Sequence, residues 1–252
     1  MNNMISSSNI VKTYSEGEEK YKVLNDVTIE IYEGEFVTIM GPSGSGKTSL
    51  MFALSGMDAI DSGSILFDHR ELSELEEREL ADLRRNKMGF IFQQPTMIKN
   101  LNILDNIILP SSNHANQSMK ELTKKAKTLM SKTGISGLEK RNITQVSGGQ
   151  LQRAGICRAL MNNPKIIFGD EPTGALNSKA ALEIMKLLLE IHTKGTTMML
   201  VTHDVNVAAH SERILFMQDG SIVSELRLEA FDGNNLDCRV KAVSKRLQEV
   251  GI

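Results

Sequence analysis

The chain has 252 residues, enough to bury a sizeable hydrophobic core in one large domain or two small ones. Its 29 basic residues nearly balance its 31 acidic residues, and the net charge of -2 gives no general electrostatic attraction to nucleic acid, which we do not expect as a partner. No segment approaches the roughly 18 apolar residues of a membrane span, and the start MNNMISSSNI has no basic region before a long apolar stretch. We therefore expect a cytoplasmic chain that is soluble by itself.

The pattern along the chain is that of an α/β protein. Residues 22–31 and 63–68 alternate apolar and polar positions, which predicts a flanking antiparallel sheet. Three short apolar runs are bounded by Gly, Asp or Pro and predict buried parallel strands: residues 36–40, 165–169 and 196–202.

Helical patterns fill most of the remaining chain. Residues 71–85 predict one surface helix with a single buried stripe of Leu72, Leu75, Leu80 and Leu83. The stretch between Leu104 and Pro164 contains no convincing strand and is predicted to be helical, with one polar loop at residues 111–118. Residues 178–195 predict a crossover helix stopped by Gly195.

The tail beyond residues 220–228, which predict the last strand, has an apolar stripe at helical spacing: Leu236, Val240, Val243, Leu247 and Val250. It predicts a helix docked on the core or on a partner, with core packing favoured. The two cysteines, Cys157 and Cys238, are far apart and form no C-x-x-C pair, which indicates neither a disulfide framework nor a zinc site. We expect both to be buried or inert thiols.

The first candidate site is GPSGSGKT, which fits the phosphate-binding pattern G-x-x-x-x-G-K-[ST] and lies between a predicted strand and a helix. Glycines let backbone N–H groups approach a β-phosphate, Lys47 neutralises phosphate charge, and the Thr48 hydroxyl can ligate Mg²⁺. A plain glycine turn is the alternative, but it gives no packing reason for Lys-Thr here. The predicted nucleotide-binding residues are Gly41, Pro42, Ser43, Gly44, Ser45, Gly46, Lys47, Thr48 and Ser49.

A second site follows the predicted strand at residues 165–169. Asp170 and Glu171 stand at its carboxyl end, where ligands of open parallel sheets bind. Asp170 can hold Mg²⁺ through water, and Glu171 can polarise the water that attacks a γ-phosphate. The alternative, a turn that caps the next element, is disfavoured by the presence of the phosphate loop.

A third segment, VSGGQ at residues 146–150, puts two glycines in front of a predicted helix. Free N–H groups and the positive end of the helix dipole then face one point, which suits an anion, although the glycines could also simply cap the helix.

The phosphate loop, VSGGQ, DEPTG and THD occur in an order that resembles the nucleotide-binding subunit of an ABC transporter, over nearly the whole chain. The resemblance implies an α/β P-loop NTPase (RecA-like) core with an antiparallel β subdomain and an inserted α-helical subdomain at about residues 94–162. Residues 1–228 would form the ATPase domain and residues 229–252 a helical tail. It also implies a head-to-tail homodimer, in which the γ-phosphate of ATP on one chain is capped by the partner's Ser147, Gly148, Gly149 and Gln150.

The resemblance assigns further roles by position. Tyr14 matches the aromatic residue that stacks on adenine, and His203 matches the histidine that contacts the γ-phosphate. Gln93 matches the glutamine that reaches Mg²⁺ and the attacking water, with Gln94 as the alternative assignment. The implied catalytic set is Glu171, His203 and Gln93, and the implied Mg²⁺ ligands are Thr48, Gln93 and Asp170.

Two positions depart from the family pattern. Val146 replaces the common leucine before SGGQ, and Asn177 stands where the family usually has an aspartate that crosses the dimer interface. Asparagine keeps the hydrogen bonding, loses the charge, and can serve as the N-cap of the helix predicted to begin near Ser178.

Three less specific segments resemble the branch that serves macrolide export, lipoprotein release and bacitracin-type peptide resistance: residues 12–31, residues 80–93 and residues 105–110. The resemblance implies a bacterial ATPase, peripheral on the inner face of the cell membrane, that powers a separately encoded integral-membrane permease. We expect export of antimicrobial peptides or other amphiphiles. A regulatory ATPase of the cell-division type, which moves nothing, is the main alternative, whereas SGGQ and DEPTG together disfavour a simple nucleotide kinase.

Overall fold

The computed structural model describes residues 2–17, 19–112 and 118–252. The chain divides into two compact units, Met1–Ala81 with Gly195–Ile252, and Asp82–Lys194. Each unit is described by itself.

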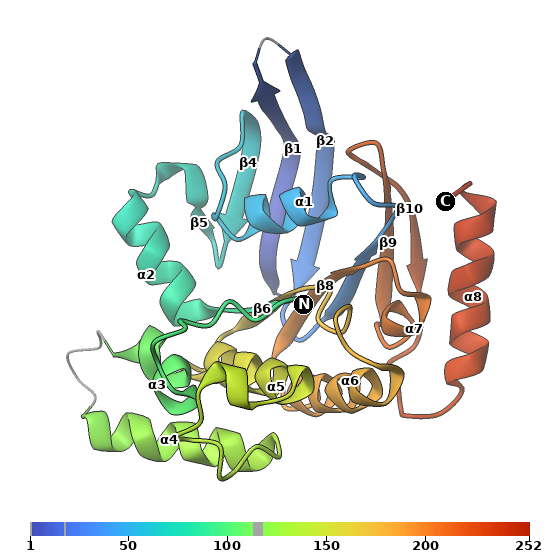
Figure 1. The fold of residues 1–252 in the computed structure, drawn as a ribbon. Coiled ribbons are helices and arrows are strands. Elements are labelled where there is room, and N and C mark those ends of the chain that lie inside the picture. Colours follow the sequence, from blue (N-terminus) through green and yellow to red (C-terminus); the bar gives the residue numbers. More distant parts are fainter. Residues whose placement is uncertain (1, 18, 113–117) are drawn as a thin grey trace. The chain divides into compact units, whose positions relative to one another are not determined.

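The first unit contains a four-stranded antiparallel sheet in the order β2-β1-β4-β5 (Figure 1). Its strands are β1 (Asn3–Glu16), β2 (Glu19–Tyr32), β4 (Ser62–Phe67) and β5 (Arg70–Glu71). This sheet confirms the antiparallel sheet predicted from the alternating residues 22–31 and 63–68, which fall in or at the end of β2 and β4, on either side of β1.

The same unit contains four neighbouring strands of a mixed sheet in the order β10-β9-β3-β8. They are β3 (Phe36–Met40), β8 (Thr197–Thr202), β9 (Arg213–Gln218) and β10 (Ser221–Arg227). β3 runs parallel to both β8 and β9, and every residue of β3 and β8 is buried, as expected for the two apolar runs. Two short helices follow strands of this sheet, α1 (Lys47–Leu54) after β3 and α7 (Val205–Ala208) after β8.

The tail forms helix α8 (Leu236–Glu249), which lies beside α7 and β10 (Figure 1). Val243 is fully buried in a cluster with Ala208, Ile214 and Phe216, and the other stripe residues pack around it. Arg239 of α8 also donates hydrogen bonds to Ala209 O and Ser211 O, both at 2.6 Å. The predicted docking of the tail on the core is therefore confirmed.

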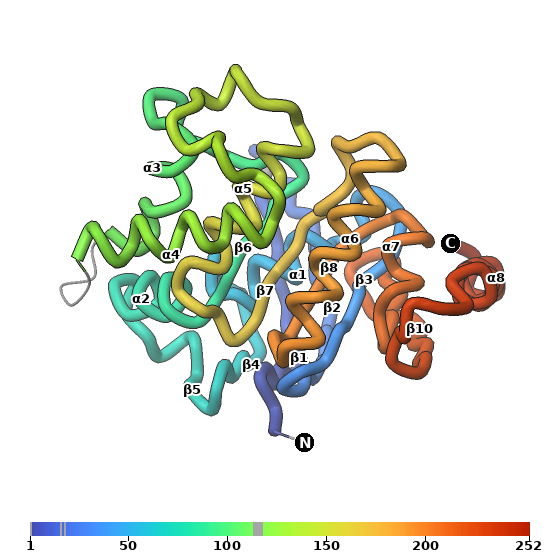
Figure 2. The backbone as a smooth tube through the Cα atoms, turned by 90° about the horizontal axis from the view of Figure 1, so that it is seen from below, coloured from blue at the N-terminus to red at the C-terminus, as the bar shows by residue number. Residues whose placement is uncertain are grey.

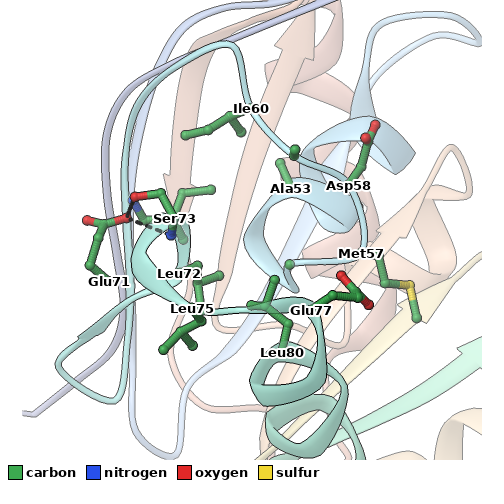
Figure 3. Close-up of a pocket in the computed structure, with 13 residues that line it drawn as sticks. Ala53, Met57, Asp58, Ile60, Glu71, Leu72, Ser73, Leu75, Glu77 and Leu80 are labelled. Atoms are coloured by element: carbon green, nitrogen blue, oxygen red, sulfur yellow. Dashed lines mark hydrogen bonds between the residues drawn. The ribbon is translucent and has the colours of Figure 1, made fainter.

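The prediction of one continuous helix over residues 71–85 is wrong. The segment folds as a single turn, η1 (Leu72–Glu74), and a separate helix, α2 (Glu77–Lys87), with extended backbone at Leu75 between them. The Glu71 carboxylate accepts hydrogen bonds from Ile65 N of β4 and Ser73 N, so this residue is held as the end of β5 and the helix cannot run through it. Figure 3 shows Leu72, Leu75 and Leu80 facing a cavity of about 370 Å³ near the end of α1.

The second unit contains two parallel strands, β6 (Met88–Phe92) and β7 (Ile166–Asp170). Its helices are α3 (Ile103–Ile108), α4 (Met119–Lys132), α5 (Gly148–Leu160) and α6 (Ser178–His192), with short turns η2 (Leu109–Ser111) and η3 (Ile143–Gln145). Helices α3, α4 and α5 lie side by side (Figure 2), and their buried apolar side chains form one cluster. Of the predicted loop at residues 111–118, residues 113–117 lie outside the described residues.

Both predictions for the helical regions hold in the part of the chain that the structure describes. No strand lies among the described residues between Leu104 and Pro164, and α6 is the helix predicted before Gly195, whose φ of 96° stops helical geometry. Among residues 2–17, 19–112 and 118–252, none of the helices combines the length and apolar character that crossing a membrane requires.

Candidate nucleotide site

The phosphate loop joins the carboxyl end of β3 to the start of α1. Gly46 has a φ of 97°, and a Cβ there would lie 2.4 Å from Val23 O. At Gly41 an added Cβ would lie 2.1 Å from Met217 O. Neither position has room for a side chain, and the resulting tight turn leads directly into the N-terminus of α1, where helix N–H groups favour an anion.

Polar groups of this loop fit a phosphate. The Lys47 ammonium is nearly buried and donates hydrogen bonds to Gly41 O at 2.9 Å and Pro42 O at 2.7 Å, which holds its charge at the loop. The Ser45 Oγ is buried and has no hydrogen-bond partner among the described residues. A bound oxyanion would satisfy this hydroxyl and meet a fixed cation, so the residues present suit a nucleotide phosphate.

Tyr14 lies on β1 and is 40% exposed as a residue, with Lys12 Nζ 5.1 Å from the centroid of its ring. Its hydroxyl donates to Asp58 Oδ2 at 2.5 Å. Burial and this hydrogen bond raise the pKa of the Tyr14 phenol, while a hydrogen bond with Ser49 of α1 lowers it. These contacts place an available aromatic face beside the helix that follows the phosphate loop.

His203 is exposed and directly follows β8. Met40 pairs with Thr202 in the parallel register of β3 and β8, so Gly41 and His203 leave adjacent strands at the same edge. Asp204 accepts a hydrogen bond from Asn206 N at 2.7 Å and caps α7. The first unit thus brings Tyr14, the phosphate loop and His203 together.

The second unit places Gln93 and Glu171 in the same way. Phe92 and Asp170 are the last residues of the parallel strands β6 and β7, and they pair with each other. Gln93 and Glu171 therefore directly follow the ends of neighbouring strands. Glu171 has a φ of 45°, a left-handed conformation that costs about 1–3 kcal/mol in a non-glycine residue and concentrates at functional sites. The side chain of Gln93 lies against the turn that follows β7. A Cβ added at Gly174 of that turn would be 2.9 Å from Gln93 Nε2.

The SGGQ segment forms the start of α5. Ser147 is the N-cap: its Oγ accepts from Gln150 N at 3.3 Å, and Gln150 Oε1 accepts from Ser147 N at 2.8 Å. The cap is therefore Ser147 and not the glycine pair, since Gly148 and Gly149 are the first two residues of α5, and the Ser147 hydroxyl proton stays available to donate to an anion. Ser147, Gly148, Gly149 and Gln150 line a cavity of about 320 Å³.

Asn177 lines the same cavity and is the predicted N-cap of α6, since its Oδ1 accepts from Ala180 N at 2.9 Å. Sequence reasoning missed Gln152, a buried amide on α5 that bonds to the backbone beside both Gln93 and Glu171. The only signal for it was one polar residue on the inner side of a predicted helix.

Comparisons with known proteins agree with this geometry. The family model described as ABC transporter matches residues 24–174. The chain is 42% identical over 236 residues to the ABC transporter ATP-binding protein MJ0796 of Methanocaldococcus jannaschii, which covers 91% of this chain and 99% of that protein. A structure of MJ0796 titled as a dimeric post-hydrolysis state bound to ADP and Pi has a TM-score of 0.84 at 40% identity, covering 90% of this chain and 100% of that one.

Export proteins are also similar. The chain is 39% identical over 243 residues to the macrolide export ATP-binding/permease protein MacB of Mannheimia succiniciproducens, covering 96% of this chain and 38% of that protein. It is 42% identical over 222 residues to the probable syringafactin export ATP-binding/permease protein SyfD of Pseudomonas syringae pv. syringae, covering 88% of this chain and 34% of that protein. The chain thus spans little more than a third of the length of these two relatives.

The fold and the phosphate loop define an α/β P-loop NTPase. The chain belongs to the ABC transporter family and carries its ATP-binding domain, with ATPase activity.

Proposed function

We propose that two copies of this chain form a head-to-tail homodimer that binds ATP with Mg²⁺ at two composite sites and powers a separately encoded membrane permease. The observation that carries the proposal is the phosphate loop, with its fixed Lys47 and a buried Ser45 hydroxyl that finds no hydrogen-bond partner in the part of the chain that the structure describes. The SGGQ helix start supports it, because its residues line a cavity at the N-terminus of α5, where helix N–H groups favour an anion.

Each group of proposed site residues has its own role in ATP binding or hydrolysis. Residues 41–49 hold the phosphates, Tyr14 stacks on adenine, and the partner's SGGQ segment caps the γ-phosphate. The Glu171 carboxylate orients the attacking water and accepts its proton, while the bond from the γ-phosphorus to the bridging oxygen breaks and ADP leaves. His203 and Gln93 hold the γ-phosphate and the water in line.

Thr48, Asp170 and Gln93 supply oxygen atoms of the kind that Mg²⁺ prefers. When bound, Mg²⁺ neutralises charge on the β- and γ-phosphates. In this proposal residues 1–228 form the ATPase domain, with the helical insertion at about residues 94–162, and residues 229–252 form a tail.

The similarity to export ATP-binding/permease proteins favours transport over a regulatory role without transport. We therefore propose export of antimicrobial peptides or other amphiphiles, with the chain held at the inner face of the cell membrane by its permease. ATP-dependent uptake of such compounds into inverted vesicles, with and without the co-purified permease, tests this part. A complex that hydrolyses ATP but moves none of them supports the regulatory alternative.

The Glu171→Gln variant tests the ATPase site. We expect it to bind ATP normally and to hydrolyse it about 10²- to 10⁴-fold more slowly, because the amide cannot accept the proton of the attacking water. An ATP-loaded dimer should accumulate and elute early in size-exclusion chromatography. Glu190→Gln, an exposed change on α6, is the matched control and should keep the full rate. Near-normal hydrolysis by Glu171→Gln would rule out the role of this carboxylate.

A further inference from the structure

Gln152 is a buried amide on α5 whose two bonds both lead toward the proposed catalytic residues. Its side-chain Nε2 donates to Phe92 O at 3.1 Å and to Pro172 O at 2.7 Å. Both partners are carbonyl oxygens, which only accept hydrogen bonds, so the NH₂ group must face them. The residue is 1% exposed, and water does not compete for these bonds.

The two carbonyl groups belong to the turns that carry Gln93 and Glu171. Phe92 ends β6 and immediately precedes Gln93, whereas Pro172 immediately follows Glu171. The turn after β7 is closed by a hydrogen bond from Gly174 N to Glu171 O at 3.0 Å. One amide group therefore joins the backbone beside the water-positioning glutamine to the backbone beside the general base.

Within the part of the chain that the structure describes, the Gln152 side chain is satisfied at its NH₂ group and not at its oxygen atom. Gln152 Oε1 is buried and accepts no hydrogen bond from the described residues, so its desolvation is not offset there. An apolar side chain of similar size would avoid that loss but would remove the donor that both carbonyl groups share, so the amide is needed only if these two carbonyl groups must be joined. Glu171, in turn, has a left-handed backbone that persists only if its surroundings hold it, and the bond to Pro172 O is such a restraint.

The same face of α5 also contacts residues 95 and 96, which follow Gln93 in the segment after β6. Gly155 approaches Pro95, since an added Cβ would lie 3.4 Å from the Pro95 Cβ, and Arg158 donates to Thr96 O. Gln152, Gly155 and Arg158 are spaced by three residues and lie along one side of the helix. Residues on both sides of Gln93 therefore contact α5. Of these α5 residues, Gln152 also bonds to the backbone next to Glu171.

We propose that Gln152 is a positioning residue for ATP hydrolysis, which fixes Gln93 and Glu171 relative to each other through Phe92 O and Pro172 O. The inference rests on the proposed roles of Gln93 and Glu171. It assigns Gln152 no contact with the nucleotide.

Gln152→Met tests the proposal, because methionine has a similar length and volume but no N–H donor. We expect nucleotide affinity close to that of the wild type and a kcat about 10- to 100-fold lower, since small displacements of reacting groups cost this much. Asn162→Leu is the matched control. Asn162 stands just beyond the other end of α5, donates to Arg85 O at 2.8 Å and accepts from Ser111 Oγ at 2.6 Å, so its replacement also removes two side-chain amide bonds, away from the proposed site. The control should lower the melting temperature similarly and keep kcat.

A double-mutant cycle distinguishes positioning from general loosening. Single-turnover hydrolysis is measured for Gln152→Met, Glu171→Gln and the double variant. If Gln152 acts through Glu171, the Gln152→Met substitution should slow the Glu171→Gln variant by only about twofold, because the carboxylate that Gln152 positions is already absent. Three results would each overturn the proposal. Gln152→Met could slow the wild type and the Glu171→Gln variant by the same factor, or it could keep a kcat like that of Asn162→Leu. It could also lose enough nucleotide affinity to account for its lower rate.

If Gln152→Met does not fold, Gln152→Asn replaces it in the same cycle, with the amide retained but one methylene too short to reach both carbonyls. Failure of the proposed function has a different result, in which Glu171→Gln itself hydrolyses ATP at a near-normal rate.

Discussion

At the scale of single residues, the two thiols differ because their surroundings differ. Cys157 is buried in the apolar cluster of the second unit, where desolvation raises the pKa of its thiol to about 11, whereas Cys238 is exposed on α8. Only the thiolate reacts with electrophiles, and a raised pKa leaves little of it near neutral pH. The expectation that both thiols are buried or inert therefore holds for Cys157, while Cys238 is accessible.

We predict that maleimide near neutral pH labels Cys238 in the native protein and labels Cys157 only after denaturation. Peptide mass spectrometry of the labelled chain identifies the modified position. Cys238→Ser should leave the native protein unlabelled. Rapid modification of Cys157 without unfolding would show that the helical cluster opens far more readily than its burial indicates.

Residues of the site were predictable to different degrees. The phosphate loop and the Asp170–Glu171 pair follow short apolar runs, so motif and predicted strand end coincide in the amino-acid sequence. Gln152 was not predictable, because its role depends on two backbone carbonyl groups that lie 60 and 20 residues away along the chain. The left-handed backbone of Glu171 is equally invisible in a sequence, since glutamate has no preference for it.

At the scale of elements, burial did not decide which strands were predictable, because β6 and β9 are largely buried and were missed, as β1 was. β3 and β8 are continuous apolar runs, but β1 contains three consecutive serines and was missed. β1 lies between β2 and β4, and the buried Ser7 Oγ donates to Ile29 O at 3.1 Å, so tertiary pairing satisfies a residue with low strand preference. The break at Leu75 was missed for a similar reason, because hydrogen bonds from β4 fix Glu71.

The start of α6 gives a prediction for helix capping. Asn177→Ala removes the acceptor for Ala180 N and should lower the free energy of unfolding by about 0.5–2 kcal/mol, as measured by urea unfolding. Asn177→Asp keeps the acceptor and adds a negative charge at a helix N-terminus, so it should match or slightly exceed the wild type. Lys179→Ala, an exposed change in the same turn, is the control and should change stability by less than about 0.5 kcal/mol. A stable Asn177→Ala variant would mean that the cap bond is exchanged for water at no net cost.

The tail helix gives a second prediction at this scale. Val243→Ala removes two methyl groups from a fully buried site and should destabilise the protein by about 1–3 kcal/mol. Lys241→Ala, on the exposed side of α8, should have little effect. Urea unfolding followed by circular dichroism compares the two variants. Equal stabilities would contradict the docking of α8 on the first unit, and an effect on transport alone would assign the stripe to a partner.

At the scale of the whole molecule, the proposed function requires two chains. The cavity beside Ser147 and Asn177 has N–H and hydroxyl donors for a phosphate, and the phosphate loop has its own donors in Lys47 and Ser45. In the proposed dimer each group supplies half of a composite site, and the two halves of one site come from different chains. This arrangement makes a prediction that no single-chain arrangement shares.

Lys47→Ala and Ser147→Arg should each inactivate a homodimer, the first by losing phosphate binding and the second by blocking closure on the partner's nucleotide. In a mixed dimer both defects fall in one composite site, and the other site combines an intact Lys47 with an intact Ser147 from the partner. Mixing the two inactive proteins should therefore restore part of the ATPase rate, with subunit exchange verified by different affinity tags. Coupling between the sites can keep the recovered rate below half that of the wild type.

Wild-type chains carried through the same exchange control for losses during mixing. No recovery in verified mixed dimers means either that both groups serve the same chain's nucleotide or that one intact site cannot turn over alone. A covalently linked tandem with one defect in each half and a nucleotide-occupancy probe in each half separates these outcomes. ATP occluded against exchange, and not merely bound, in the half that carries Ser147→Arg, whose Lys47 is intact, shows that the site is closed by Ser147 of the other half, even without hydrolysis. Equal failure of both halves to retain ATP would contradict the cross-chain site, because one complete composite site remains in that tandem.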